Sequence, residues 1–416
     1  MTLSASPTVA EPPTARRLAA LLAAGMLLGA APLLAQRPVS MEEAVTATLE
    51  RGTGVALAVA DYALAAAEVA GARAFPNPIL SADYTEDVPQ RHGEIEQPLE
   101  YPWVRGPRIR AAEAAARASA RVLDTERARA RREAVVAYVE AAAARTLSEL
   151  SAVDAAAGDQ LLEFALQRRD AGDASDLDVA LAEMAAARAA GEALGDSIAA
   201  VDAVLRLQIV MAEPADRIAI VPVDTLVLPV SAFRPPPDTE ERAVVAASEA
   251  RLDSSQEALR EASRARLPAP AVRAGLEGHD PAEDTGLLST AGVSLEIPIF
   301  DRGGAAVATA RAEVTRSRAE LEAARRESDA ALLLATRARD GAIARAEEAA
   351  RVRRSALRVT EMTAIGYREG EISIPDVLEA RREAREAMRA WVGAAVDAWT
   401  ATADWDLAAA VGSSSP

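Results

Sequence analysis

Residues 293–303 read VSLEIPIFDRG and join two stretches of different periodicity. In residues 287–297, which include the start of this segment, apolar side chains alternate with small or polar ones, which is the signal of a strand. After them, residues 304–369 contain many alanines and no proline, and they predict a single helix about 100 Å long. A short strand that leads directly into a very long helix is therefore the central expectation for this chain.

The features around this segment occur twice in the same order, which indicates an internal repeat. In each copy a capping-box motif opens a helix, prolines end that helix, a Leu-Glu-x-Pro element ends a strand, and a Gly-x-x-Ser-x-x-Asp turn joins two helices. The matching segments lie about 190 to 200 residues apart, and they are 40–43 and 238–241, 73–78 and 264–270, 99–102 and 295–298, and 172–179 and 370–377.

The repeat predicts the domain organisation. We expect a signal peptide at 1–35, a first repeat at 36–213, a proline-rich linker at 214–237, a second repeat at 238–411 and a disordered tail at 412–416. Each repeat is expected to contain a helix, two strands, a long helix, a tight turn and a further helix. The expected helices are approximately 41–74, 107–171 and 176–212, then 240–267, 304–369 and 375–411. The expected strands are 79–85, 94–101, 271–278 and 287–297, with a short one in the linker at 219–230.

The helix lengths suggest how these helices pack. In each copy the two shorter helices together match the long helix, so we expect them to stack end to end beside it in a rod of about 100 Å. Val307, Val314 and Leu321 recur every seven residues, which is typical of a coiled-coil seam. The predicted fold class is mostly α, with long coiled-coil hairpins and a small β part of four strands per chain.

The N-terminal segment is typical of a secretory signal. Arg16 and Arg17 precede an apolar run at residues 18–34, and Ala35 offers a small residue for cleavage. The alternative is a transmembrane anchor, because the run is almost long enough to span a bilayer. No later segment is apolar for 18 residues without charges, so the chain is expected to be exported and to cross a membrane, if at all, with strands.

Composition excludes several classes of function. A net charge of −17 disfavours binding to nucleic acid, and the absence of cysteine excludes disulfides, thiolate catalysis and cysteine-based metal sites. The two histidines, His92 and His279, are expected in exposed turns rich in Gly, Asp and Glu. We find no nucleophile with a neighbouring base, no phosphate-binding loop and no metal-ligand spacing. We therefore expect no enzyme activity, no cofactor and no metal site.

The expected strands have one apolar and one polar face, and the polar face carries carboxylates. The candidates to line a lumen are Glu94, Glu96, Glu100, Glu277 and Glu296. Rings of carboxylates would favour cations, although these side chains would also serve simply to keep a lumen hydrated. Four strands cannot close a barrel, so a membrane interpretation requires several chains, and three chains would give twelve strands.

Four aromatic side chains occur at the ends of the strands that face the helices. They are Phe75, Tyr101, Trp103 and Phe300. An aromatic girdle at a membrane interface would have this arrangement. The alternative is a set of aromatic side chains that cap a small soluble sheet.

The two Gly-x-x-Ser-x-x-Asp turns lie a full long helix away from the strands. Their residues are Gly172, Ser175, Asp178, Gly370, Ser373 and Asp376. Glycine after a helix, and serine followed by aspartate at the start of the next one, are helix caps. Capping alone explains these six residues, so a docking or gating role is an additional hypothesis.

Together these motifs resemble the TolC family of outer-membrane efflux proteins. The resemblance covers roughly residues 39–411 and is carried by residues 40–45, 75–78 and 293–303 and by the two turns. It implies a homotrimer with a shared twelve-stranded β-barrel in the lipid bilayer of the outer membrane and a long α-helical tube in the periplasm. The linker and terminal segments would form an equatorial belt. The element at 75–78 is most similar to the branch that exports heavy-metal cations, and the chain lacks the cysteine that carries the lipid anchor of some members.

The resemblance also implies partners and site residues. The six turn residues match in position the turns that meet a periplasmic adaptor protein, which couples the tube to an inner-membrane pump. The periplasmic gate of the family lies at the same level, where Asp173, Asp176, Tyr367 and Arg368 are the candidates for its contacts. The implied function is a passive exit duct of a tripartite efflux or type I secretion system. The alternative is a periplasmic or secreted coiled-coil scaffold without a channel.

Overall fold

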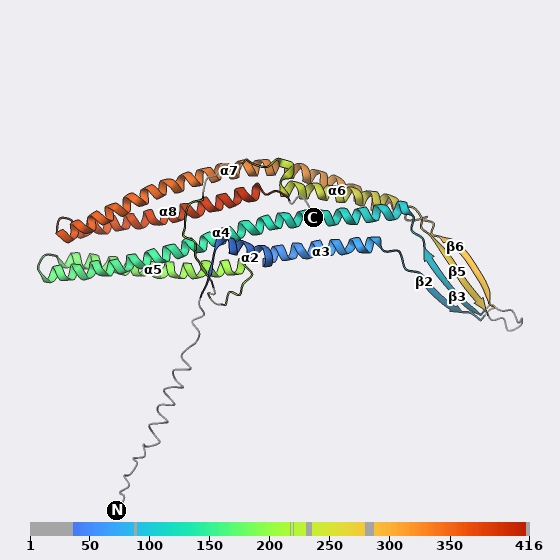
Figure 1. The fold of residues 1–416 in the computed structure, drawn as a ribbon, viewed down its shortest axis with the longest axis horizontal. Coiled ribbons are helices and arrows are strands. Elements are labelled where there is room, and N and C mark those ends of the chain that lie inside the picture. The colour runs from blue at the N-terminus through green and yellow to red at the C-terminus, as the bar shows by residue number, and fades with distance from the viewer. Residues whose placement is uncertain are drawn as a thin grey trace, which may run out of the picture.

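The computed structural model describes residues 36–86, 90–216, 218, 220–229, 235–278 and 287–412. These residues form a curved rod of long helices with a small sheet at one end (Figure 1). The prediction of a mostly helical chain with a small β part is confirmed. The expected signal peptide, His279 and residues 413–416 of the expected tail lie outside the described residues.

The two halves of the described chain contain the same order of main elements. The first half has α2 (Met41–Arg51), α3 (Thr53–Arg73), β2 (Ile79–Tyr84), β3 (Arg91–Pro98), α4 (Pro102–Asp170) and α5 (Asp176–Val210). The second half has the short 3-10 helix η1 (Thr239–Glu241), α6 (Ala243–Arg264), β5 (Pro270–Gly278), β6 (Leu288–Leu295), α7 (Gly304–Glu369) and α8 (Ile374–Ala408). Two short strands, β1 (Arg37–Val39) and β4 (Ile220–Pro222), pair in parallel beside the rod.

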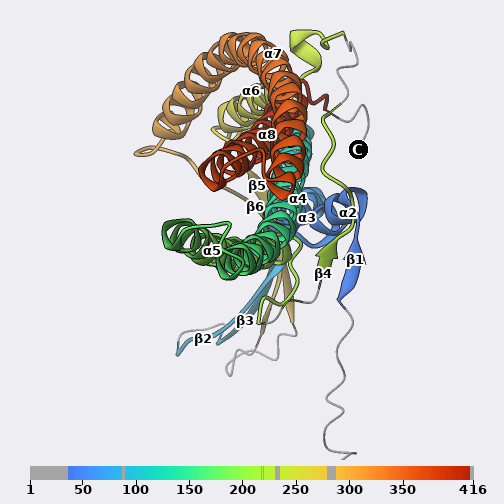
Figure 2. The same ribbon diagram turned by 90° about the vertical axis from the view of Figure 1, so that its left-hand side faces the viewer.

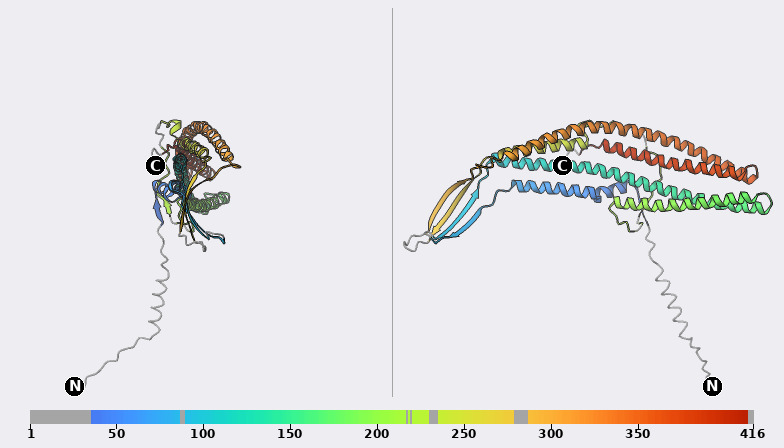
Figure 3. Two further views of the ribbon diagram at one scale, coloured as in Figure 1. Left: turned by 90° about the vertical axis from the view of Figure 1, so that its right-hand side faces the viewer. Right: turned by 180° about the vertical axis from the view of Figure 1, so that it is seen from behind.

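Each long helix is accompanied by two shorter ones, as the helix lengths predict. The 69-residue α4 contacts α3 along one part of its length and α5 along the other, and the 66-residue α7 contacts α6 and α8 (Figure 3). In the seam between α6 and α7, Leu321 is buried and Val307 and Val314 are half-buried. The rod therefore has four helical columns, and the two hairpin tips lie at the end opposite the sheet.

Alanine dominates the core and allows the helices to approach closely. Ala134, Ala141 and Ala165 are fully buried. At Gly158 of α4, an added Cβ would lie 3.3 Å from the Cα of Ala186 in α5, which is tighter than ordinary contact. Small residues along these seams explain how a chain with few aromatic side chains packs long helices against one another.

The expected first helix and the two expected capping boxes differ from the structure. The first helix, expected to be continuous over 41–74, is interrupted because Gly52 adopts an extended ψ of 137°. Ser40 caps α2 as expected, but the carboxylate of Glu43 pairs with Arg37 and does not complete a capping box. The capping box expected at 238–241 is wrong, because Asp238 makes no side-chain cap bond, and a 3-10 turn separates it from the start of α6 at Ala243.

The first long helix begins at Pro102, five residues before the expected start. Proline is favourable in the first turn, where its missing N–H would have no helical partner. Pro107 consequently lies inside α4, in its second turn. The second long helix has the expected bounds, Gly304–Glu369.

Tyr138 connects the rod to the segment between the two halves. Its side chain is 1% exposed, and its hydroxyl lies 2.9 Å from the carbonyl oxygen of Val39 and 2.8 Å from a carboxylate oxygen of Asp224. The same carboxylate accepts the backbone N–H of Met41 at 2.9 Å. Viewed from the tips, β1, β4 and α2 lie together on one side of the rod (Figure 2). Tyr138 therefore stabilises the belt formed by β1, β4 and the start of α2.

Tyr138 is expected to ionise only at very alkaline pH. Burial, with a smaller contribution from the charge of Asp224, raises the pKa of Tyr138 from 10.0 to about 12. Because the folded pKa is raised, the stabilisation that this tyrosine provides is complete below pH 10 and is lost as the pH rises through about 12. Absorbance at 295 nm should show delayed ionisation in the wild type and loss of the most delayed component in Tyr138→Phe. An unchanged titration in this variant would contradict the assignment.

The four strands at the end of the rod form one antiparallel sheet in the order β2-β3-β5-β6. The two expected hairpins are joined through β3 and β5, while β2 and β6 are the edges of the sheet in the single chain. His92, which was expected in a loop, lies in β3 opposite Asp83 and Glu277, because that strand begins three residues earlier than expected.

Candidate functional site

One face of the sheet is apolar and exposed in the single chain. In an antiparallel ladder directly opposed residues share a face, so the pairs Leu80–Ile95 and Val272–Val293 place their side chains on this face. Leu80 is 78% exposed and Val293 is 68% exposed. The remaining apolar members of this face are Ala82, Tyr84, Ala274, Leu276, Ala291 and Leu295.

The opposite face is largely polar. Glu94 lies across from Ser81 and Gly275, and Glu96 lies across from Ile79 and Arg273. The register also places the following polar residues on this face: Asp83, His92, Glu277, Thr290 and Ser294. The alternation deduced from the sequence is present in all four strands, although Ile79 and Leu288 lie on the polar face and Arg91 and Gln97 lie on the apolar face.

Three of the five predicted lumen carboxylates lie on this polar face, namely Glu94, Glu96 and Glu277. The other two lie beyond the strands. Glu100 is bound to Arg108 at 2.6 Å in the connection to α4 and has a side chain only 10% exposed. Glu296 is exposed, one residue after the end of β6.

The four aromatic residues lie at the end of the sheet next to the helices. Tyr101 and Trp103 stack with their ring centroids 4.2 Å apart, and the guanidinium group of Arg105 lies 4.5 Å from the centroid of Phe75. Phe300 is fully exposed. Large apolar rings are thus exposed at one level of the rod, where the strands meet the helices.

The two turns at the other end have the expected glycines, but only the first has the expected serine cap, because Ser373 makes no side-chain bond to the backbone of α8. Gly172 and Gly370 adopt positive φ values of 86° and 82°, which favour glycine. Ser175 and Asp178 form a complete capping box, and hydrogen bonds from Ser175 lower the pKa of Asp178. The Ser373 hydroxyl donates to the Asp376 carboxylate at the equivalent place.

The two helical tips of one chain are joined through Tyr367. This side chain is 4% exposed and packs edge-on against Phe164, with the ring centroids 5.6 Å apart. The guanidinium group of Arg168 lies 5.2 Å from the centroid of the Tyr367 ring and contacts the carbonyl oxygens of Tyr367 and Asp173 at 3.5 Å and 3.3 Å. Burial raises the pKa of Tyr367. Ile374 of α8 and Ala165 of α4 belong to the same buried cluster.

The other predicted gate residues have different surroundings. Asp173, Asp176 and Arg368 are exposed, and the side chain of Arg368 donates to the carbonyl of Ala364 in its own helix. Sequence reasoning missed Arg168 and Phe164 as contacts of Tyr367. No local pattern indicates the contact of Arg168 with a residue of the other hairpin.

A row of arginines on α8 also joins the two hairpins. Arg385 bonds to Asp154 of α4 at 2.9 Å, and Arg389 bonds to Asp196 of α5 at 2.7 Å. Arg381 donates to the carbonyl of Ala157 at 3.0 Å, and burial lowers the pKa of Arg381. The three arginines are spaced by four residues and therefore share one face of α8.

Comparison with known proteins agrees with this geometry. Residues 239–413 match the family described as outer membrane efflux protein. This match covers most of the second half of the chain. No curated protein matches the sequence, but several solved structures share the fold.

The structural similarity covers nearly the whole described chain. The CmeC outer membrane channel of Campylobacter jejuni has a TM-score of 0.75 at 16% identity, covering 90% of this chain and 87% of that chain. A membrane protein from Pseudomonas aeruginosa has a TM-score of 0.74 at 18% identity, covering 88% and 93%. The outer membrane protein VceC of Vibrio cholerae has a TM-score of 0.72 at 15% identity, covering 89% and 96%.

The matched family is one of outer membrane efflux proteins, and the similar structures include an outer membrane channel and an outer membrane protein. The described residues include one helical segment with the length and composition of a membrane span, Met41–Arg73. This segment is broken at Gly52 and packs against α4, while Leu57 and Leu64 remain 62% exposed. Part of the apolar surface of this segment is therefore exposed in the single chain.

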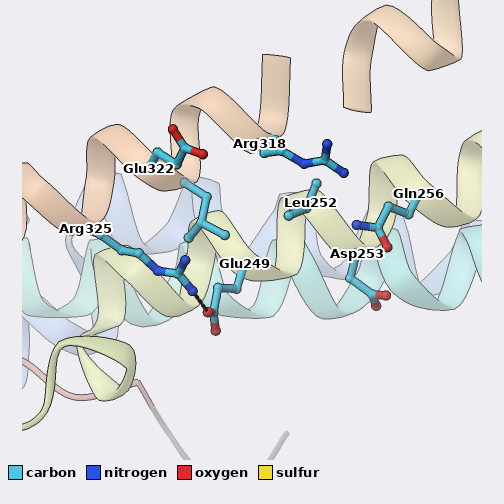
Figure 4. A pocket seen from close by; sticks show the side chains of 8 residues that line it. Glu249, Leu252, Asp253, Gln256, Arg318, Glu322 and Arg325 are labelled. Carbon is cyan, nitrogen blue, oxygen red and sulfur yellow. Dashed lines mark hydrogen bonds and ion pairs between the residues drawn. The ribbon is translucent and has the colours of Figure 1, made fainter. Parts of the chain in front are cut away.

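A charged groove of about 500 Å³ lies between α6 and α7 (Figure 4). Arg325 of α7 bonds to Glu249 of α6 at 2.8 Å, and Asp253 and Glu322 line the same groove. Burial and a hydrogen bond with Glu240 raise the pKa of Glu249. Within the described ranges no group of three histidine, aspartate or glutamate residues could hold a metal ion. We interpret this groove as an ion-pair network that joins two helices.

Proposed function

We propose that this protein is the exit duct of a tripartite efflux or type I secretion system and that it works as a homotrimer. In this proposal three chains share one twelve-stranded barrel, and solutes move passively through a helical tube while an inner-membrane pump supplies the energy. The observation that carries the proposal is the four-stranded sheet, which has one exposed apolar face and two edges that pair with no further strand among the described residues of the single chain.

Open sheet edges in hydrocarbon would leave backbone groups without hydrogen bonds, which costs several kcal/mol for each group. Pairing β2 of one chain with β6 of the next would remove every edge when three chains close the ring. The apolar face would then contact lipid, and the polar face with Glu94, Glu96 and Glu277 would line the lumen. The exposed aromatic rings at the base of the sheet fit the interface between lipid and periplasm.

The tips are the proposed site of docking and gating. The two capped turns, with Gly172, Ser175 and Asp178 in one and Gly370, Ser373 and Asp376 in the other, present exposed backbone to a periplasmic adaptor protein. Tyr367, with Arg168, would hold the two hairpins of one chain together in the closed state. Asp173, Asp176 and Arg368 remain candidates for contacts with other chains, because they are exposed.

The test is the mass of the detergent-extracted protein after inner and outer membranes are separated on a density gradient. We expect a trimer in the outer-membrane fraction and ion conductance when that trimer is added to planar bilayers. A soluble monomer or dimer would refute the proposal and would favour a coiled-coil scaffold, since the strands would then have no barrel to complete.

A further inference from the structure

The polar face of the sheet contains one arginine among its carboxylates. Asp83, Glu94, Glu96 and Glu277 are the acidic residues of this face within the described strands, and Arg273 is its only arginine or lysine there. Arg273 lies directly opposite Glu96 and pairs with the carboxylate of Glu94 at 3.5 Å. A guanidinium group in this position partly neutralises the negative charge of the carboxylates on the neighbouring strand, β3.

The position of this charge is determined by the backbone of the sheet. Arg273 is the fourth residue of β5, an inner strand that is paired with β3 on one side and β6 on the other. Its Nε–H is buried without a hydrogen-bond partner in the described part of the chain, while 42% of the side chain remains exposed. The charged end therefore stays at the surface of the polar face, beside Glu94.

We infer that Arg273 determines the charge selectivity of the duct, an inference that rests on the proposed function. As a fixed counter-charge in the barrel wall, it cancels the field of Glu94 and weakens that of Glu96. The lumen then keeps a moderate preference for cations and does not exclude anionic solutes. Without Arg273 the ionisable side chains of this face in the described strands would be the four carboxylates and His92, and anions would be repelled more strongly.

Reversal potentials in a potassium chloride gradient test this inference on the full-length trimer in planar bilayers. Arg273→Gln is expected to raise the ratio of potassium to chloride permeability by roughly twofold to fivefold, because water screens a unit charge at this distance. The double variant Glu94→Gln/Arg273→Gln removes both members of the pair and is expected to return close to the wild-type ratio. Arg91→Gln is the matched control, because Arg91 lies on the adjacent strand but on the opposite face.

An Arg273→Gln channel with normal conductance and the wild-type permeability ratio would overturn the inference. An equal change in Arg91→Gln would also overturn it, because the effect would then not depend on the face that the charge occupies. Wild-type protein that forms no channel would instead refute the proposed function itself, and the two failures are therefore distinguishable.

Discussion

Replacing Tyr367 with alanine is expected to open the periplasmic end of the duct and raise its single-channel conductance. Tyr367 is 4% exposed and joins α7 to α4 through Phe164 and Arg168. Loss of a buried aromatic side chain removes about 3–5 kcal/mol of packing. Tyr367 contacts both Phe164 and Arg168 of the other hairpin, so this loss is expected to weaken the junction between the hairpins, even though several leucine and isoleucine side chains belong to the same cluster. Conductance in planar bilayers measures the result.

Arg168→Ala is expected to change conductance in the same direction but by less, because the ring of Tyr367 still packs against Phe164. Asp176→Ala tests the other gate candidate at the same tip. Its side chain is exposed, so within one chain its loss disturbs no buried contact. If Tyr367→Ala formed trimers with unchanged conductance, the contact would have only a structural role. If Asp176→Ala alone raised the conductance, the gate would instead depend on contacts between chains.

The parts of the fold that depend on local periodicity could be predicted from the sequence. The bounds of α7 were predicted to the residue, because Gly303 and Gly370 adopt positive φ values at its two ends and no proline lies between them. The register also agrees with the predicted faces, since the side-chain period of two is a property of each strand alone.

The break in the first helix and the contacts between hairpins could not be predicted in this way. A single glycine within a helix is usually tolerated, so nothing in the sequence distinguishes the extended Gly52 from the helical Gly71. The Arg385–Asp154 ion pair joins residues separated by 231 positions. Such a contact follows from how the two hairpins pack, and a local pattern on α8 does not contain that information.

The contact of Arg168 with Tyr367 has the same origin. Each residue lies near the end of its own long helix, where an arginine suits the helix dipole and a tyrosine suits many environments. Only the packing of α4 beside the end of α7 and the start of α8 brings them together. The positions of the two turns were therefore predictable from their glycine and serine residues, but the contact between the hairpins was not.

Introducing arginine on the apolar face of the sheet is expected to prevent assembly in the outer membrane. Leu80 is 78% exposed and lies opposite Ile95 on this face. Arginine on the lipid face of a barrel costs about 2–4 kcal/mol at the bilayer midplane. A homotrimer would carry this cost three times, so Leu80→Arg should remove trimers from the outer-membrane fraction. Membrane fractionation followed by electrophoresis without heating measures the loss.

The neighbouring residue supplies the matched control for this substitution. Ser81 lies on the polar face opposite Glu94, where a new arginine would face the proposed lumen and meet a carboxylate. Ser81→Arg is therefore expected to assemble and insert normally, although it adds the same side chain one residue away. If both variants inserted equally well, the sheet would not contact lipid. If Ser81→Arg alone failed, the two faces would be oriented in the opposite sense, and the assignment of Glu94 and Arg273 to the lumen would fail with it.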